Sequence, residues 1–362
     1  MSKRAYNFNP GPAALPVEVL QKAQETFVDY NGIGMSLTEI SHRSKEYEAL
    51  NRETQELMLE LLGLSSGYQV LFLGGGASMQ FSMIPLNFLK PGKVGSYLVT
   101  GSFSEKAYQD AKIVGEAVIA ASNKETSWRS LPKAGDIRID PNSAYVHMTT
   151  NNTIEGSQWS DIPETGDIPL IGDMTSGILS RPIDAHKFAM IYAGAQKNLG
   201  PAGVTVAVIR DDLLQEEPKH VPVMLRYTTH AKNQSLYNTP PVHSIYVVNL
   251  MLKWVKENGG VEAMEKQNVA KTKLLYDVID TSGGFYTGNI DPDSRSIMNV
   301  TFRLPSEELE KAFVKESEKN NFVGLAGHRS VGGIRASAYN AVPYEACAAL
   351  AEFMVDFQKR NG

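Results

Sequence analysis

The sequence predicts an α/β protein with a large domain built on a mostly parallel seven-stranded sheet flanked by helices, and a smaller α+β domain at the C-terminal end. The first observation is a series of short apolar runs between residues 68 and 210 that alternate with helical patterns. These runs are apolar along their whole length, which is typical of strands covered on both faces. The second observation is a change to long helical patterns after residue 243. The seven candidate strands are YQVLFL, SYLVT, EAVIA, AYVHMT, IPLIGD, FAMIYAG and VTVAVIR.

Helical periodicity and stop signals place the other elements. Apolar residues between Ser44 and Leu62 fall on one helical stripe, and Gly63 follows as a stop signal. Strands are expected around SIMNVTFRL and GGIRASAY, and further helices over 243–258, 261–280, 306–320 and 343–359. We therefore expect a large domain over residues 16–258 and a small domain formed by residues 1–15 together with 259–362.

The composition argues against several classes of partner. The chain has 362 residues and 39.7 kDa, with 40 acidic against 35 basic residues, a net charge of -5 and a pI near 5.9. A chain with this slight excess of negative charge is not expected to bind nucleic acid or an anionic membrane through its overall charge. The single cysteine, Cys347, argues against a disulfide framework or a cysteine-cluster metal site, and it suits a reducing cytosol. The N-terminal residues MSKRAYNFNPGPAALP lack the apolar run of a signal peptide, so we expect a cytoplasmic protein.

Lys197 is the first candidate for chemistry. It stands in FAMIYAGAQKNLGPAGVTVAVIR, where two apolar strands flank a hinge of small residues. Ligands of open α/β sheets bind outside the ends of such strands, so a long amine at this place points into a candidate site. A solvated loop lysine is the plain alternative for any single lysine. The small residues around Lys197, which leave room beside it, favour the site.

Asp173 ends the strand IPLIGD, 24 residues before Lys197. A carboxylate at a neighbouring strand end could pair with a pyridinium nitrogen and keep a cofactor ring protonated as an electron sink. The alternative is an aspartate that caps a helix N-terminus.

A third candidate is the junction between a strand and a helix in LFLGGGASMQFSMIPLNFL, with the helix opening near Ala77 and Ser78. Free backbone N–H groups and the helix dipole make such a junction an anion site, although three glycines can also form only a tight turn. A dinucleotide fingerprint would need a glycine at position 79, which is Met79. No phosphate-loop or HExxH zinc motif is present in the sequence.

Aromatic and basic side chains complete the set of candidates. Phe103, after the strand SYLVT, could stack on a flat ring or could belong to the core. The segments SHRS and GHRSVGGIRAS hold two histidines and three arginines, and arginine suits a carboxylate or phosphate because it donates two parallel hydrogen bonds. We interpret these clusters as an anion clamp in a chain that is otherwise acidic, with solvated surface charge as the alternative.

These segments together resemble the phosphoserine aminotransferase family, whose members are class V enzymes of fold type I that depend on pyridoxal 5′-phosphate (PLP). The resemblance covers essentially the whole chain. It rests on FNPGPAALP, ISHRS, FLGGGASMQF, TGSFSEKA, TTNNTIEG, DMTS, YAGAQKNLGPAG, TPPVHSIY and GHRSVGGIRAS. The segment around the lysine alone would indicate only the superfamily.

The resemblance implies roles for individual residues. Lys197 would carry PLP as a Schiff base, Asp173 would pair with the pyridine nitrogen, and Arg335 would hold the α-carboxylate of the substrate. The remaining cofactor contacts would come from Ala77, Ser78, Phe103, Thr153 and Gln196, and from Asn238 and Thr239 of a partner subunit in a homodimer. The distal anion of the substrate would be held by His42, Arg43, His328 and Arg329. Many members have Trp where this chain has Phe103, so ring stacking should survive with less overlap.

The implied activity is transamination between L-glutamate and 3-phosphohydroxypyruvate in L-serine biosynthesis, with 4-phosphohydroxythreonine in vitamin B6 synthesis as an open second substrate. Another class V aminotransferase that acts on an unphosphorylated acid such as glyoxylate is one alternative. A cysteine desulfurase is a second, but it needs a mobile reactive cysteine and Cys347 lies in a core-like helix. The third is a non-catalytic PLP-binding protein that kept the scaffold.

Overall fold

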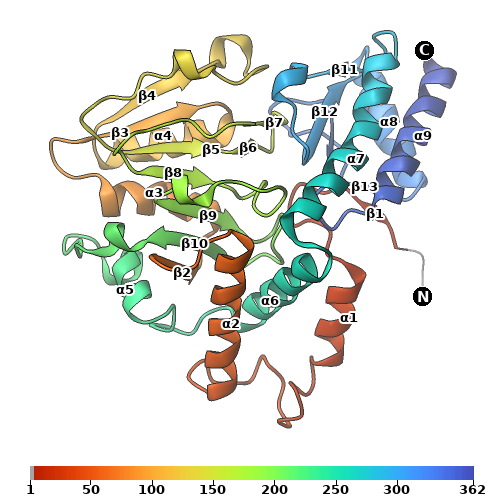
Figure 1. Cartoon of the computed structure of the whole chain (residues 1–362). Coiled ribbons are helices and arrows are strands. Elements are labelled where there is room, and N and C mark those ends of the chain that lie inside the picture. The colour runs from red at the N-terminus through yellow and green to blue at the C-terminus, as the bar shows by residue number, and fades with distance from the viewer. Residues whose placement is uncertain (1–3) are drawn as a thin grey trace.

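The structure of the chain, a computed structural model, describes residues 4–362 (Figure 1). Residues 1–3 of the expected N-terminal arm lie outside the described residues. The central feature is a seven-stranded sheet in which β10 runs antiparallel to both neighbours while the other neighbouring pairs are parallel. In spatial order its strands are β2 (Tyr68–Leu73), β10 (Thr205–Arg210), β9 (Met190–Gly194), β8 (Leu170–Asp173), β5 (Ser143–Thr149), β3 (Val94–Val99) and β4 (Ala117–Ser122). Each of the seven apolar runs forms one of these strands, so the α/β prediction is confirmed.

Helices cover both faces of this sheet, which explains why the strands are apolar on both sides (Figure 1). One face packs against α1 (Val17–Glu25), α2 (Lys45–Leu61) and α6 (Val242–Glu257). The other face packs against α3 (Gly76–Phe88), α4 (Ser102–Val114) and α5 (Tyr227–Lys232). The helix expected from Ser44 is α2, and the Ser44 hydroxyl caps it by accepting a hydrogen bond from the Tyr47 backbone N–H at 3.2 Å.

A second hydrophobic core lies beside the sheet, where the C-terminal half of the chain meets its N-terminal segment. Its helices are α7 (Gly260–Thr281), α8 (Glu307–Lys319) and α9 (Tyr344–Asn361). Its strands are β11 (Thr287–Gly288), β12 (Asn299–Arg303) and β14 (Ile334–Ser337), with β1 (Tyr6–Asn7) pairing in parallel with β13 (Phe322–Val323). Phe8 is buried in this core, so the N-terminal segment packs with residues more than 260 positions away. The smaller α+β unit predicted from the sequence is present.

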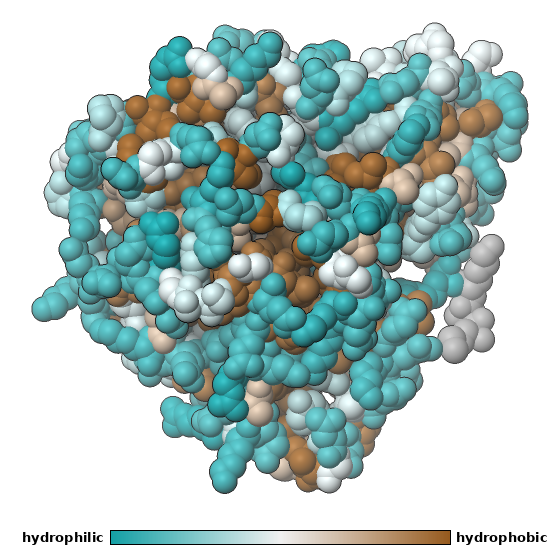
Figure 2. All heavy atoms as spheres, viewed as in Figure 1, coloured by the Kyte–Doolittle hydropathy of each residue, from teal (hydrophilic) through white to brown (hydrophobic). Residues whose placement is uncertain are grey.

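Short elements connect these layers. A hairpin of β6 (Asn151–Asn152) and β7 (Ser157–Gln158) reaches from the sheet toward the second core. Single 3₁₀ turns occupy Lys124–Thr126, Ala134–Asp136, Ala185–Lys187, Asp211–Leu214, Val223–Leu225 and Pro292–Ser294. Figure 2 shows a largely hydrophilic face with hydrophobic side chains gathered in a hollow near its middle. No helix within residues 4–362 combines the length and hydrophobicity needed to cross a membrane.

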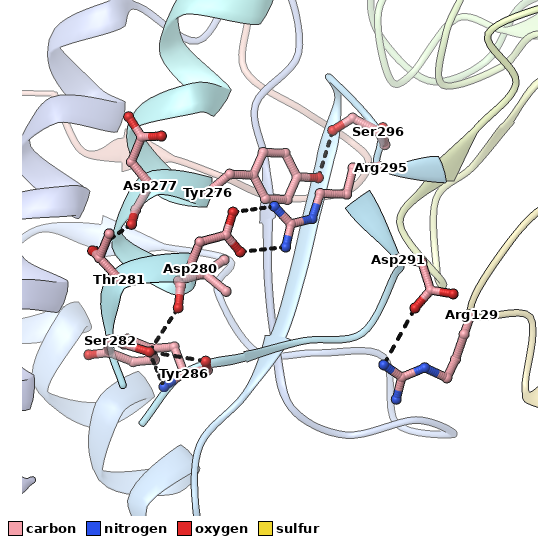
Figure 3. Close-up of polar contacts among 11 residues, drawn as sticks. Arg129, Tyr276, Asp277, Asp280, Thr281, Ser282, Tyr286, Asp291, Arg295 and Ser296 are labelled. Atoms are coloured by element: carbon pink, nitrogen blue, oxygen red, sulfur yellow. Dashed lines mark hydrogen bonds and ion pairs between the residues drawn. The ribbon is translucent and has the colours of Figure 1, made fainter. Parts of the chain in front are cut away.

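Arg295 ties the end of α7 to the strands of the second core (Figure 3). Its guanidinium donates two hydrogen bonds to Asp280, at 2.7 and 2.6 Å, and lies 4.6 Å from the ring centre of Tyr276. The Tyr276 hydroxyl donates to the Ser296 carbonyl at 2.8 Å. The bonds from Arg295 hold the pKa of Asp280 below its usual value. This ion pair therefore stabilises the folded state in a way that depends on pH.

We predict that Asp280→Asn lowers the free energy of unfolding at pH 7 by about 0.5 to 1 kcal/mol, because Asp280 is half-exposed and solvent weakens such pairs. The folded state has the lower pKa, so this contribution is complete above the unfolded pKa of about 3.9 and is lost as the pH falls through the folded pKa. Urea denaturation across this pH range measures the difference. Asp277→Asn is the control, since Asp277 lies on the same helix and pairs with Lys273 at the surface. An equal loss in the control, or a loss independent of pH, would contradict the prediction.

Candidate active site

Lys197 and Asp173 meet at the carboxyl ends of two neighbouring parallel strands. Asp173 is the last residue of β8, and Lys197 follows the end of β9 at Gly194. Both line a cavity of about 250 Å³. The other residues that line it are Gly75, Gly76, Ala77, Ser78, Phe81, Phe103, Thr149, Asn151, Thr153, Thr175, Ser176 and Gln196. A larger cavity of about 690 Å³ lies between the N-terminal segment, α7 and α9, but Lys197 and Asp173 do not line it. The smaller cavity is therefore the candidate site.

The amine of Lys197 is held in place by a chain of hydrogen bonds. Its Nζ donates to Thr153 Oγ1 at 2.6 Å and lies 4.9 Å from the ring centre of Phe103. Thr153 Oγ1 lies 2.9 Å from Ser176 Oγ, which donates to the Asn151 carbonyl at 2.9 Å. Burial lowers the pKa of Lys197 to about 8, with a further lowering by Arg335 and opposite contributions from Asp173 and Glu155. A minor fraction of this amine is therefore neutral at pH 7, and this fraction can act as a general base.

Asp173 is a buried carboxylate, only 4% exposed. Its Oδ1 accepts hydrogen bonds from the backbone N–H of Thr175 at 2.9 Å and from the Thr175 hydroxyl at 2.6 Å. Burial raises the pKa of Asp173, while the bonds from Thr175 and the charge of Lys197 oppose the rise. The residues after Asp173 form a turn, so this carboxylate does not cap a helix. It is available to a positively charged ring nitrogen in the cavity.

The N-terminus of α3 forms an anion cradle at one side of the cavity. The helix has no side-chain cap, and its first backbone N–H groups, from Gly76 to Ser78, precede the first intrahelical bond from Met79. Gly75 adopts a φ of +81°, and a Cβ at this position would lie 2.5 Å from the Met79 Cβ. Glycine is therefore required for the turn that directs these N–H groups into the cavity. Ala77 and Ser78 line it, as expected from the sequence.

Two further side chains indicate that the cavity fits a flat polar group. Phe103, the second residue of α4, lines the cavity and also packs on the core, and its stacking on a ring stays a prediction. Thr149 Oγ1 is buried at the end of β5 and has no hydrogen-bond partner within residues 4–362. A buried hydroxyl without a partner is costly unless a ligand satisfies it.

Arg335 approaches the same site from the second core, on β14. It is 6% exposed, its Nη1 lies 3.4 Å from the Thr153 carbonyl oxygen, and its Nε has no partner in the part of the chain that the structure describes. His328 and Arg329 lie on the loop before β14. Burial lowers the pKa of His328, and the positive charges of Arg335, Lys106 and Arg329 lower it further. The charge of Arg335 thus acts both on Lys197 and on His328.

Seven of the residues singled out from the sequence do not line the Lys197 cavity. Arg335 is one of them, although its Nη1 reaches the carbonyl of Thr153, which does line it. The others are His42, Arg43, Asn238, Thr239, His328 and Arg329. Two of them come together, because Thr239 Oγ1 lies 3.2 Å from His42 Nδ1. Arg43, Asn238 and Thr239 are exposed, and the His42 Nε2 atom is buried without a partner among the described residues.

Sequence reasoning missed several polar residues of the cavity. Thr149, Asn151, Thr175 and Ser176 all line it, and the charge of Glu155 acts on Lys197. The sequence does indicate these residues, because the polar segments TTNNTIEG and DMTS each begin at the last residue of a predicted strand. Polar residues that follow parallel strands collect at one edge of the sheet.

Comparisons with known proteins agree with this geometry. The pattern of the family "Aminotransferase class-V" matches residues 5–350. The chain belongs to the class V aminotransferase family. It is 59% identical over its whole length to a phosphoserine aminotransferase of Niallia circulans, which it also covers completely. The solved phosphoserine aminotransferase of Bacillus circulans subsp. alkalophilus is 58% identical and superposes with a TM-score of 0.99 over 100% of both chains.

A more distant aminotransferase shares the same architecture. The solved "PLP bound phosphoserine aminotransferase" of Trichomonas vaginalis is 38% identical to this chain and superposes with a TM-score of 0.93. The match covers 97% of this chain and 100% of the Trichomonas chain. The resemblance inferred from the sequence is thus confirmed, and so are the fold and the aminotransferase class. The cysteine desulfurase alternative loses its basis, since Cys347 is buried in α9 and burial raises its pKa to about 12.

For this class V aminotransferase we predict that Lys197→Met stabilises the protein without bound cofactor by roughly 3 kcal/mol at pH 7. The folded pKa near 8 lies below the unfolded value, so the charged amine destabilises the fold fully below pH 8. This cost disappears as the pH rises from 8 to about 10.4. Chemical denaturation at pH 7 and pH 10.5 measures it, with Lys45→Met at the exposed start of α2 as the control. A less stable Lys197→Met protein at pH 7 would contradict the prediction.

Proposed function

We propose that this protein transfers the amino group of L-glutamate to 3-phosphohydroxypyruvate, giving 2-oxoglutarate and O-phospho-L-serine, the aminotransferase step of L-serine biosynthesis. The observation that carries the proposal is the joint placement of the Lys197 amine and the Asp173 carboxylate at adjacent strand ends, in one cavity. The full-length similarity to phosphoserine aminotransferases supports the choice of substrates.

The residues of the cavity fit PLP. The free N–H groups at the start of α3 suit its phosphate, and Phe103 suits one face of its ring. Asp173 suits the pyridine nitrogen, while Thr149 Oγ1 and Thr153 offer polar contacts to ring substituents. Gln196 lines the cavity next to Lys197. When bound, PLP supplies an electron sink for the negative charge that develops at the substrate Cα.

Lys197 is the group that moves the proton. Its Nζ takes the proton from the substrate Cα, because a pKa of about 8 leaves a useful fraction of the amine neutral at physiological pH. The Thr153 hydroxyl accepts a hydrogen bond from this amine and orients it beside the Phe103 ring. The same amine would pass that proton to the bound cofactor within the first half of the reaction and would deliver a proton to the Cα of the product in the second, so one base serves both substrates.

Cationic side chains select the substrate. Arg335 is buried and has an unpartnered Nε, so an α-carboxylate can accept its charge-assisted hydrogen bonds. His328 and Arg329 on the preceding loop bind the distal anion, either the phosphate of 3-phosphohydroxypyruvate or the side-chain carboxylate of glutamate. The compound 4-phosphohydroxythreonine, in pyridoxine biosynthesis, presents the same two anionic groups.

A homodimer completes the site. Thr239 contacts His42, and their sequence neighbours Asn238 and Arg43 are exposed. None of these four residues lines the cavity of its own chain. In the dimer, Asn238 and Thr239 reach the cofactor phosphate of the other subunit, and His42 and Arg43 reach the distal anion of its substrate. A two-fold axis brings each chain's patch to the partner's cavity, as closed symmetry requires.

The same proposal extends to domain boundaries and location. Residues 16–258 form the cofactor domain, and residues 1–15 with 259–362 form the small domain, which is supported by the pairing of β1 with β13. The protein works in the cytoplasm, where a single buried thiol such as Cys347 stays reduced.

We predict that kcat/KM for 3-phosphohydroxypyruvate, with glutamate as amino donor, exceeds the values for glyoxylate and pyruvate by at least about 100-fold, because a polar pocket rejects analogues that leave it unpaired. Arg329→Ala should lower kcat/KM for 3-phosphohydroxypyruvate by about 10- to 100-fold and change glyoxylate turnover much less. Steady-state assays measure both. If kcat/KM for glyoxylate equals that for 3-phosphohydroxypyruvate, the protein is an aminotransferase for unphosphorylated acids. If the parent protein binds PLP but is inactive with every substrate, it is a non-catalytic PLP-binding protein.

We predict that Lys197→Ala and Arg43→Ala homodimers are each nearly inactive, and that mixing them under subunit exchange restores about a quarter of the parent activity. Half of the dimers are then mixed, and each mixed dimer has one complete site. The control mixes Lys197→Ala with Arg335→Ala, two residues that serve the same subunit's cavity, and should restore nothing. Recovery in the control, or none in the first mixture, would contradict the shared site.

A further inference from the structure

Glu155 is a buried carboxylate that the proposed mechanism does not use. It lies in the turn between β6 and β7, two residues after Thr153, and is 6% exposed. It does not line the Lys197 cavity. A carboxylate this deeply buried needs compensating partners, because transfer of its charge from water is costly.

One oxygen of Glu155 fixes the beginning of α4. Glu155 Oε1 accepts hydrogen bonds from the backbone N–H of Ser102 at 2.8 Å and from the Ser102 hydroxyl at 2.6 Å. Ser102 is the first residue of the helix, and Phe103, which lines the cavity, is the second. The carboxylate therefore acts at a helix N-terminus, where negative charge is favourable.

The other oxygen of Glu155 is buried without a hydrogen-bond partner among the described residues. A Cβ on Gly101 would lie 2.5 Å from this Oε2, so the chain leaves space for it only by having glycine there. The buried Nε of Arg335 is also unpartnered among the described residues. Burial raises the pKa of Glu155, while the hydrogen bonds from Ser102 and the charge of Arg335 oppose the rise. The negative charge of Glu155 also reaches the amine of Lys197.

Three charged groups thus act on the amine of Lys197. Asp173 at the end of β8 and Glu155 in the hairpin carry negative charge, and Arg335 on β14 carries positive charge. Without Glu155, Lys197 and Arg335 would face a single carboxylate, whose role is to pair with a cofactor nitrogen.

We propose that Glu155 is a positioning residue of the aminotransferase site, whose charge balances Lys197 and Arg335 while its Oε1 anchors the helix that carries Phe103. This inference rests on the proposed function. The backbone of Glu155 adds a link to the small domain, because its carbonyl accepts a hydrogen bond from Thr301 Oγ1 of β12 at 2.6 Å. The segment from Thr153 to Glu155 thus contacts both Arg335, which would bind the substrate, and Lys197, which would move the proton.

The test is a pH titration of the absorbance of the bound cofactor in the holoenzyme, which follows the protonation of nitrogen on Lys197. Glu155→Gln removes the charge and keeps an oxygen that can accept from Ser102. Its titration midpoint should fall by about half a pH unit or more, because a nearby negative charge favours the protonated form. The glutamate KM and the melting temperature are measured on the same samples.

Two controls separate charge from structure. Glu105→Gln removes a carboxylate from α4, the helix that Glu155 anchors. Glu105 pairs with Lys124 near the surface, so this variant should leave the titration midpoint unchanged. Ser102→Ala removes one hydrogen bond to Glu155 and keeps the charge, so it should lower the melting temperature with little change in the midpoint. Glu155→Met is a second neutral variant of similar length and should give the same shift as Glu155→Gln.

The possible results are distinct. A midpoint shift in the neutral Glu155 variants alone supports the inference. An unchanged midpoint in a folded neutral variant, or an equal shift in the controls, overturns it. Failure of both neutral variants to fold also overturns it, because Glu155 would then be needed for folding rather than for the site. Lack of phosphoserine formation by the parent protein would instead reject the proposed function, and the titrations would still stand.

Discussion

The burial of one amine is the constraint on which the site depends. A lysine is seldom buried, because removing its charge from water is costly. Here Lys197 is held at the end of β9 by the Thr153 hydroxyl, and its pKa falls to about 8. The fold thus accepts an unfavourable environment for Lys197 in exchange for an amine that can act as a base at neutral pH.

The polar groups around this amine also join the two cores of the molecule. Asn151 Nδ2 donates to Ser176 Oγ at 2.7 Å and to Asn299 Oδ1 at 2.8 Å, so one side chain bonds both to the site and to β12. Arg335 enters from β14 and meets the Thr153 carbonyl. The distance between the substrate clamp and the proton-transferring amine is therefore set by the packing of the small domain on the sheet.

Much of this arrangement follows from local patterns in the sequence. The apolar runs identify all seven strands, because strands buried on both faces cannot be polar. The rule that ligands bind at the carboxyl ends of parallel strands brings Lys197 and Asp173 together without any structure. Glu155 could not be found in this way, since its importance comes from a contact with Ser102, 53 positions earlier in the chain. Nor can one chain show what faces His42, because residues at a surface acquire their neighbours only in an assembly.

We propose that Lys197 forms the covalent link to pyridoxal phosphate. Borohydride reduction of the PLP-loaded protein, followed by proteolysis and mass spectrometry, tests this link most directly, because reduction makes it permanent. We predict one modified peptide, containing YAGAQKNLGPAG, with the cofactor mass on Lys197. A modification on another lysine, or none in a protein that forms phosphoserine, would contradict it.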